Sequence, residues 1–228
     1  MIIYGKQVCL YALKHHSSSI KRVYLAKKGL LSQPLFDQFK PKIKFLENRW
    51  AQSMSKGGNH QGILIDMDEL EFSDFSQMKK SDFIIVLDGL TDSGNIGAIV
   101  RTAYALGVDG VIATGVKQLN LSTITRTSSG ALLDMPFMIS NNILDILNEL
   151  HQLGFVSYGA SMDGRSIESM DFAPKRVLVL GSEDRGLSKR VISKTKEMVS
   201  IEMKEDFDSL NVSAAAAILI HRMGYAIR

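Results

Sequence analysis

Cysteine is nearly absent from this sequence, with Cys9 alone among 228 residues. A single thiol excludes an intrachain disulfide and leaves too few sulfur ligands for a cysteine-based metal site. Long apolar runs are missing as well, since none approaches the roughly 18 residues that a membrane-spanning helix needs. The first residues, Met-Ile-Ile-Tyr-Gly-Lys, lack the basic-then-apolar layout of a signal peptide. These absences predict a cytoplasmic protein that does not enter a membrane.

Histidine is also scarce, with five residues scattered along the chain and no H-x-x-x-H pair. We therefore expect no metal site. What is present is ordinary for a globular protein: 45% hydrophobic and 22% charged residues. The length fits one large domain or a small domain joined to a medium one.

The net charge of +3 conceals an asymmetry between the two ends of the chain. Residues 1–66 contain 11 Lys and Arg against 3 Asp and Glu, whereas the remainder contains 16 against 21. The first segment therefore has a net charge of +8 and the second −5. Such a split indicates a basic module that meets a polyanion, although the solvated face of a small domain explains it equally well.

Patterning divides the chain into the same two parts. Residues 1–66 predict a small α/β unit, with helices at 8–13 and 33–39 and strands at 22–26 and 61–66. Residues 67–80 are polar and acidic and predict a linker. From there to residue 228, apolar strands at 83–87, 110–113, 155–158 and 176–180 alternate with helices at 96–106, 143–153 and 212–225. This alternation predicts an α/β domain, residues 81–228, with a mostly parallel sheet covered on both faces.

The first segment with chemical potential follows the strand at 83–87. It reads Asp88-Gly-Leu-Thr-Asp-Ser-Gly-Asn95-Ile-Gly97 and leads into a helix that contains Arg101. The glycines let backbone approach a ligand, but a Gly-rich turn beside a surface arginine explains the same letters. The dinucleotide fingerprint G-x-G-x-x-G and the P-loop lysine are both absent.

Two further segments lie near the C-terminus. The strand at 176–180 ends in Gly181-Ser-Glu183-Asp-Arg-Gly186, and Ser209-Leu-Asn211 precedes the apolar run 214–220. A structural turn and an ordinary helix N-cap are the alternative explanations. Ligands of parallel sheets bind at the carboxyl ends of the strands, so we expect these polar side chains at one edge.

The order of these segments resembles the three motifs of the SPOUT-class RNA methyltransferases, SpoU (TrmH-like) branch. The segment Thr127-Ser-Ser-Gly-Ala-Leu132 is similar to that family's central motif. Tyr4-Gly-Lys6 and His60-Gln-Gly62 are similar to the N-terminal RNA-recognition domain of its ribosomal members, which makes His60 a candidate RNA contact. The resemblance covers nearly the whole chain.

The resemblance implies a SPOUT fold whose C-terminal segment forms a deep trefoil knot, preceded by an RNA-binding domain at residues 1–66. It implies a homodimer that uses S-adenosylmethionine to methylate a ribose 2′-hydroxyl, without a metal. The implied cofactor residues are Gly181, Ile201, Met203 and Leu210. The implied catalytic residues are Asn95, Arg101, Glu183, Ser209 and Asn211.

The family account gives Arg101 the task of deprotonating the hydroxyl. A guanidinium stays protonated in proteins, so we favour phosphate binding by Arg101, with the proton passing to a phosphate oxygen or water. The basic module favours ribosomal RNA as the target, and the resemblance implies a guanosine in 23S ribosomal RNA. Transfer RNA is the alternative, because the transfer-RNA members generally lack such a module.

Three residues depart from the family pattern: Ser93 and Glu202 stand where proline is usual, and Glu205 replaces a usual glycine. The loop before Ser209 is acidic, because it contains Glu202, Glu205, Asp206 and Asp208. This departure keeps open a non-catalytic RNA-binding protein on the same fold. A nucleotide-dependent oxidoreductase is the third possibility, and the missing glycine fingerprint disfavours it.

Overall fold

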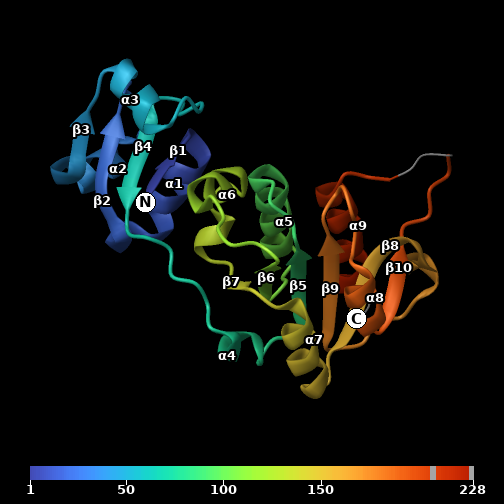
Figure 1. The fold of residues 1–228 in the computed structure, drawn as a ribbon. Coiled ribbons are helices and arrows are strands. Elements are labelled where there is room, and N and C mark those ends of the chain that lie inside the picture. Colours follow the sequence, from blue (N-terminus) through green and yellow to red (C-terminus); the bar gives the residue numbers. More distant parts are fainter. Residues whose placement is uncertain (206–208, 226–228) are drawn as a thin grey trace. The chain divides into compact units, whose positions relative to one another are not determined.

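The computed structural model describes residues 1–205 and 209–225 (Figure 1). Its first compact unit joins Met1–Glu71 with Asn120–Leu133, and the second joins Phe72–Leu119 with the described part of Asp134–Arg228. Asp206 and Asp208 of the acidic loop lie outside the described residues.

The first unit is built on a four-stranded mixed sheet of order β1-β4-β2-β3. Strand β4 is antiparallel to β1 and β2, and β2 is parallel to β3. The strands are β1 (Ile2–Tyr4), β2 (Ile20–Leu25), β3 (Ile43–Phe45) and β4 (Ile63–Met67). The helices are α1 (Lys6–His15), α2 (Gln33–Phe39), α3 (Asn48–Met54) and α6 (Leu121–Thr127). The sequence did not predict β1, β3, α3 or α6, because none is longer than seven residues and short elements show little periodicity.

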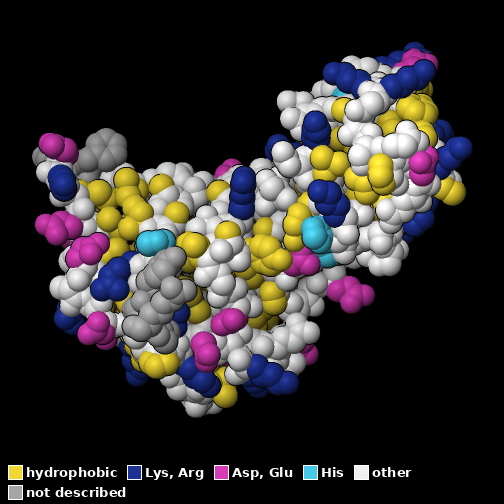
Figure 2. All heavy atoms as spheres, turned by 180° about the vertical axis from the view of Figure 1, so that it is seen from behind, with side chains coloured by type: hydrophobic (Ala, Val, Ile, Leu, Met, Phe, Trp, Pro, Cys, Tyr) yellow, Lys and Arg dark blue, Asp and Glu magenta, His cyan; other side chains and the backbone are white. Residues whose placement is uncertain are grey.

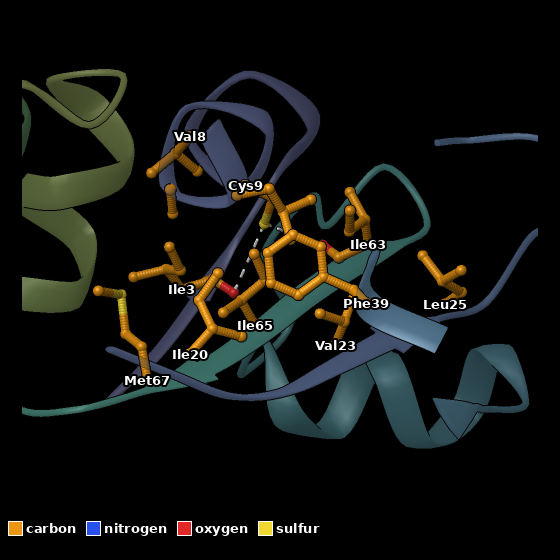
Figure 3. Packing of buried hydrophobic residues seen from close by; sticks show 12 residues of the cluster. Ile3, Val8, Cys9, Ile20, Val23, Leu25, Phe39, Ile63, Ile65 and Met67 are labelled. Atoms are coloured by element: carbon orange, nitrogen blue, oxygen red, sulfur yellow. Dashed lines mark hydrogen bonds between the residues drawn. The ribbon is translucent and has the colours of Figure 1, made fainter. Parts of the chain in front are cut away.

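The core of this unit gathers apolar side chains from the sheet, α1 and α2 (Figure 3). Ile3, Phe39 and Ile65 are at most 3% exposed. Each such side chain contributes about 1.5–3 kcal/mol by leaving water. Cys9 lies among them, and its Sγ faces the carbonyl oxygens of Ile3 and Ile63 at 3.9 and 3.8 Å. Burial raises the pKa of this thiol, which therefore behaves as a small apolar core residue.

Residues 120–133 complete the first unit although they are far away in sequence. The Ser122 hydroxyl donates to the carbonyl of Ile2, and the Arg126 guanidinium lies 5.4 Å from the centre of the Tyr4 ring. Leu133 packs against the core described above. The segment that resembles the family's central motif is therefore part of this unit, outside the continuous stretch of 1–66.

The second unit contains a six-stranded sheet of order β10-β8-β9-β5-β6-β7, in which every pairing is parallel. The predicted parallel sheet is confirmed. Its strands are β5 (Phe83–Asp88), β6 (Gly110–Thr114), β7 (Phe137–Ser140), β8 (Val156–Ser166), β9 (Arg176–Gly181) and β10 (Glu197–Ser200). Asp88 is in register with both Gly181 and Thr114, so β5, β9 and β6 end at the same level.

Helices cover both faces of this sheet (Figure 1). They are α4 (Phe75–Met78), α5 (Ser93–Ala105), α7 (Ile143–Gln152), α8 (Lys189–Lys194) and α9 (Val212–Tyr225). Ile84 and Val86 of β5 share a buried cluster with α4, α7 and α8. Alternate residues of a strand point to opposite faces, so Ile85 and Leu87 face the other side, where α5 and α9 pack together. The predicted linker is thus partly helical, because Met78 of α4 is fully buried in this core.

Strand β8 bulges at its carboxyl end. The pairing with β10 jumps from Met198–Gly159 to Val199–Arg165, so residues 160–164 of β8 have no partner in β10. A Cβ on Gly164 would lie 2.4 Å from the carbonyl carbon of Val199, a contact that no side chain tolerates. The bulge moves residues 160–162 away from the sheet, to the place where the second unit is hollowed.

Candidate active site

The first motif begins α5 at the carboxyl end of β5. The Asp92 side chain caps this helix by accepting a hydrogen bond from the Asn95 backbone N–H at 2.7 Å. The helix therefore starts at Ser93, three residues before the start that its apolar pattern predicts. Capping places Asn95 in the first turn, next to the end of the sheet.

Asn95, Glu183 and Asn211 meet in one hydrogen-bonded network. Asn95 Nδ2 donates to Glu183 Oε1 at 3.0 Å. Asn211 Nδ2 donates to the same carboxylate oxygen at 2.7 Å and to Asn95 Oδ1 at 3.1 Å. The structure thus brings together one residue from each of the three motifs.

The network fixes the position of the Glu183 carboxylate. Asn211 is itself held, because its Oδ1 accepts from the backbone N–H of Ser213 at 2.9 Å and from the Ser213 hydroxyl at 2.6 Å. Two amide donors converge on Glu183 Oε1, while Oε2 has no hydrogen bond within the described part of the chain. One oxygen anchors the side chain and the other is available to a substrate.

Two of the predicted catalytic residues stand outside this network. Arg101 lies six residues after Asn95 on α5, about 9 Å along the helix axis. Its side chain is exposed and makes no hydrogen bond or ion pair with any described residue. Ser209 is exposed and lies at the pocket described next.

A pocket of about 620 Å³ opens beside the network. All four residues predicted for the cofactor line it, together with three of the predicted catalytic residues: Gly181, Ile201, Met203 and Leu210, then Glu183, Ser209 and Asn211. Its wall is completed by apolar side chains such as Leu180 and Leu219. An apolar hollow with a few convergent polar groups is typical of a small-molecule site.

Sequence reasoning missed one side of this pocket. Ala160, Ser161 and Met162 reach it from the bulge of β8, and Met198 reaches it from β10. Met162 is 69% exposed, an unusual position for a long apolar side chain. The one signal in the sequence was Gly164, because a glycine within a strand often marks a bulge.

The structure explains why residue 181 is a glycine. A glycine at the end of a strand can leave room for a ligand ring against the backbone. In the structure a Cβ there would lie 2.3 Å from the carbonyl carbon of Gly186 and 2.6 Å from the nitrogen of Leu187. The turn after β9 folds back over this position, so Gly181 is needed for the shape of the turn that holds Glu183.

A second hollow of about 550 Å³ adjoins the first. It is lined by residues 88–92 after β5, by Gly115, and by residues 182–186 and Ser188. Glu183 lines both hollows. The Thr114 hydroxyl donates to Asp88 Oδ1 at 3.0 Å, which orients that carboxylate at the end of the sheet.

His60 is not placed to contact RNA. It is 5% exposed, and its Nδ1 accepts a hydrogen bond from the Gly62 backbone N–H at 3.0 Å. Burial and the nearby charge of Lys27 lower the pKa of this imidazole. The residue stabilises the turn before β4.

Among residues 1–205 and 209–225, no three His, Cys, Asp or Glu side chains gather as a metal-ligand set. Over the same ranges, no helix has the length and hydropathy to cross a membrane.

Comparison with known proteins follows the same division of the chain. Residues 82–221 match the SpoU rRNA Methylase family, and residues 2–73 match the domain described as RNA 2′-O ribose methyltransferase substrate binding. A TrmH-family protein from Staphylococcus haemolyticus is 34% identical over 72% of this chain and 70% of its own length.

Solved structures are similar too. The AdoMet-bound rRNA methyltransferase from Sinorhizobium meliloti superposes with a TM-score of 0.80 at 20% identity, over 100% of this chain and 87% of its own. A TrmH/SpoU tRNA-modifying enzyme from A. aeolicus matches with a TM-score of 0.57 at 25% identity, over 64% of this chain and 76% of its own. The three motifs, the parallel sheet and these matches together show that the chain belongs to the SpoU rRNA methylase family of TrmH-type RNA methyltransferases.

Proposed function

We propose that this protein transfers a methyl group from S-adenosylmethionine to a ribose 2′-hydroxyl of RNA. The observation that supports this most directly is the position of Glu183. Its side chain is anchored by Asn95 and Asn211, and it lines both of the adjoining hollows. A transfer between two substrates needs two adjoining sites and a fixed polar group between them. The apolar hollow suits the cofactor and the polar hollow suits the target nucleoside.

The apolar pocket fits S-adenosylmethionine in size and in lining. Its volume of about 620 Å³ lies in the range of small-molecule sites. Ile201, Met203 and Leu210 offer apolar contact for a base, and the strand end at Gly181 offers backbone groups. When bound, the cofactor supplies an electrophilic methyl group on a sulfonium, so the reaction needs no metal.

The chain's own residues position the acceptor. Glu183 Oε2 accepts a hydrogen bond from the target ribose, while Asn95 and Asn211 keep the carboxylate from rotating. Arg101 binds the phosphate next to that ribose and stabilises the developing alkoxide. The proton passes to a phosphate oxygen or to water, because a guanidinium has none of the acceptor capacity that a base needs. Ser209 donates a hydrogen bond near the nucleophile.

The substrate that we favour is 23S ribosomal RNA, at a guanosine. The supporting feature is the N-terminal part of the first unit: residues 1–66 have a net charge of +8, and residues 2–73 match a substrate-binding domain. The tRNA-modifying neighbour matches 64% of this chain, whereas the ribosomal neighbour matches all of it. Transfer RNA remains the alternative substrate.

We also propose a homodimer that forms through α5 and α9. Tyr104 on α5 and Ile218 on α9 are 44% and 40% exposed, large values for apolar side chains on two helices that pack together. A second copy burying this surface would bring its own Arg101 to the interface. Ile218→Lys is expected to convert the dimer to a monomer in light scattering after gel filtration.

The trefoil knot is part of the same proposal. The segment after β10 returns to the ends of β5 and β9, where Asn211 contacts Asn95 and Glu183. A chain that threads a loop refolds slowly, so we expect refolding from urea to be far slower than for an unknotted parallel domain.

The decisive experiment is the mapping of 2′-O-methyl sites in the RNA of a strain that lacks this gene, compared with the parent strain. We expect one ribosomal site to disappear and to return with the wild-type gene but not with Arg101→Ala. Loss of a transfer-RNA site instead would select the alternative substrate. Cofactor titration by calorimetry with S-adenosylmethionine and with NAD would exclude the oxidoreductase, and an unchanged methylation map would favour a non-catalytic RNA-binding protein.

A further inference from the structure

Two large aromatic side chains of the first unit lie in solvent. Phe45, the last residue of β3, is 52% exposed, and Trp50 in α3 is 56% exposed. Strand β3 is the edge of its sheet, and α3 begins three residues after it ends. A small unit with a limited core has reason to bury such rings, so their exposure calls for an explanation.

A cationic side chain accompanies Trp50. The Arg49 guanidinium lies 5.4 Å from the centre of its ring. Arg49 also pairs with Glu47, its Nε standing 2.8 Å from the carboxylate. The negative charge of Glu47 is therefore balanced by Arg49, and the Arg49 guanidinium is held against the indole ring of Trp50.

The surroundings favour a polyanion as the occupant of this surface. Ten of the eleven Lys and Arg in residues 1–66 are exposed, against three acidic residues in the same stretch. Figure 2 shows Lys and Arg side chains on the surface of the first unit, with a few Asp and Glu side chains among them. Exposed aromatic rings within a basic segment suit RNA, because bases stack on the rings and the positive field attracts the phosphates.

We infer that Phe45 and Trp50 form a stacking platform for unpaired bases of the RNA substrate. The inference rests on the proposed function and specifies the form of its substrate: a loop, bulge or other single-stranded stretch must reach the first unit. Bases stack on exposed aromatic rings only where they are free of a duplex, and neighbouring cations hold the phosphates. Arg49 and the other exposed Lys and Arg side chains of residues 1–66 supply those cations here.

The chain is suited to a direct test, because Trp50 is its only tryptophan. The full-length protein is titrated with a single-stranded RNA of about 12 nucleotides, within the site sizes of single-strand binders, and Trp50 fluorescence is recorded. We expect strong quenching that saturates with binding, and much weaker quenching by the same strand annealed to its complement. Unchanged fluorescence on RNA binding would overturn the platform without any variant being made.

Variants then measure the contribution of each ring. Trp50→Leu and Phe45→Leu keep apolar bulk but remove the aromatic face. Each is expected to weaken binding of the single strand about tenfold, while the slope of log K against log salt stays the same, because no phosphate contact is lost. Phe72→Leu is the matched control: Phe72 is 49% exposed but belongs to the second unit, and its ring packs near Phe137 at 6.4 Å. A loss below twofold in both platform variants would contradict the inference.

The platform and the proposed function fail in different ways. Methyl transfer to RNA by a protein whose Trp50 does not respond would remove the platform and leave the function. Quenching without any methyl transfer would remove the function and leave the platform. In an active enzyme, Trp50→Leu should raise KM for RNA and leave kcat and cofactor affinity unchanged.

Discussion

Gly181→Ala should disable this protein although it adds a single methyl group. The new Cβ would lie 2.3 Å from the carbonyl carbon of Gly186, 2.5 Å from its oxygen and 2.6 Å from the nitrogen of Leu187. These are backbone atoms, so relief requires the whole turn to move by about 1 Å, a displacement that costs on the order of 100-fold in rate when it affects reacting groups. The turn holds Glu183, and Glu183 anchors the two asparagines.

We therefore expect methyl transfer to fall about 100-fold, with cofactor affinity also reduced because the same turn lines the pocket. Overpacking should lower the free energy of unfolding by about 1–3 kcal/mol, which leaves a folded protein to assay. Transfer of labelled methyl to RNA, calorimetry with S-adenosylmethionine and urea unfolding measure the three quantities.

Gly224→Ala is the matched control, since a Cβ there meets only the Leu106 carbonyl oxygen at 4.0 Å. It should leave transfer unchanged and stabilise α9 slightly, as alanine favours a helix over glycine. Transfer by Gly181→Ala within threefold of wild type would refute the claim that backbone approach at this glycine positions Glu183.

Four further outcomes are expected. Arg101→Ala should abolish methyl transfer and keep cofactor affinity within about tenfold, or roughly 1.4 kcal/mol, because Arg101 lies outside the pocket lining; near-normal turnover would contradict its role. Glu183→Gln keeps an oxygen acceptor for Asn95 and Asn211, so in urea unfolding it should be more stable than Glu183→Ala, which removes that acceptor and leaves Asn211 Nδ2 only its bond to Asn95 Oδ1; equal stability would show that the bonds to Glu183 contribute nothing. Because burial lowers the pKa of His60 in the folded protein, the unfolded chain is protonated at this residue first as the pH falls. The free energy of unfolding should therefore decrease as pH falls from about 6.5 toward the folded pKa. The urea midpoint should change less with pH over this range in His60→Gln than in the wild type. Binding of single-stranded RNA to the full chain should weaken with salt at a log–log slope of about −3.5, as about five of the exposed cations reach phosphates, and a slope near zero would exclude an electrostatic role for the first unit.

The sequence predicted the parallel sheet because its central strands are continuous apolar runs. Val86 of β5 and Val179 of β9 lie in such runs, and only burial on both faces tolerates them. Helix α2 was predicted with its observed bounds, Gln33–Phe39. Strand β10 gave no usable signal, because its four residues include only one that is buried.

The site was predictable at the level of motifs and less so at the level of contacts. The rule that ligands bind at the carboxyl ends of parallel strands predicted Asn95, Glu183 and Asn211 at one edge of the sheet. In the structure, hydrogen bonds connect the three side chains. That the amides bond to each other and to the carboxylate depends on side-chain geometry that no spacing encodes. The bulge of β8 could not be predicted from the sequence either, because it depends on the close approach of Gly164 to the backbone of Val199, a residue 35 positions away.

The placement of residues 120–133 in the first unit has a consequence for how this protein comes apart. The chain passes from one unit to the other three times, after Glu71, Leu119 and Leu133. A protease that nicks the segment 67–80 would cut only the first passage. The N-terminal piece would still contact α6 through Ser122 and Arg126. Its association with the rest of the chain would then be a bimolecular equilibrium, which depends on protein concentration. Two separately expressed halves should for the same reason reassemble when mixed. An exchange of N-terminal modules between relatives would have to include α6, because this helix belongs to the same compact unit.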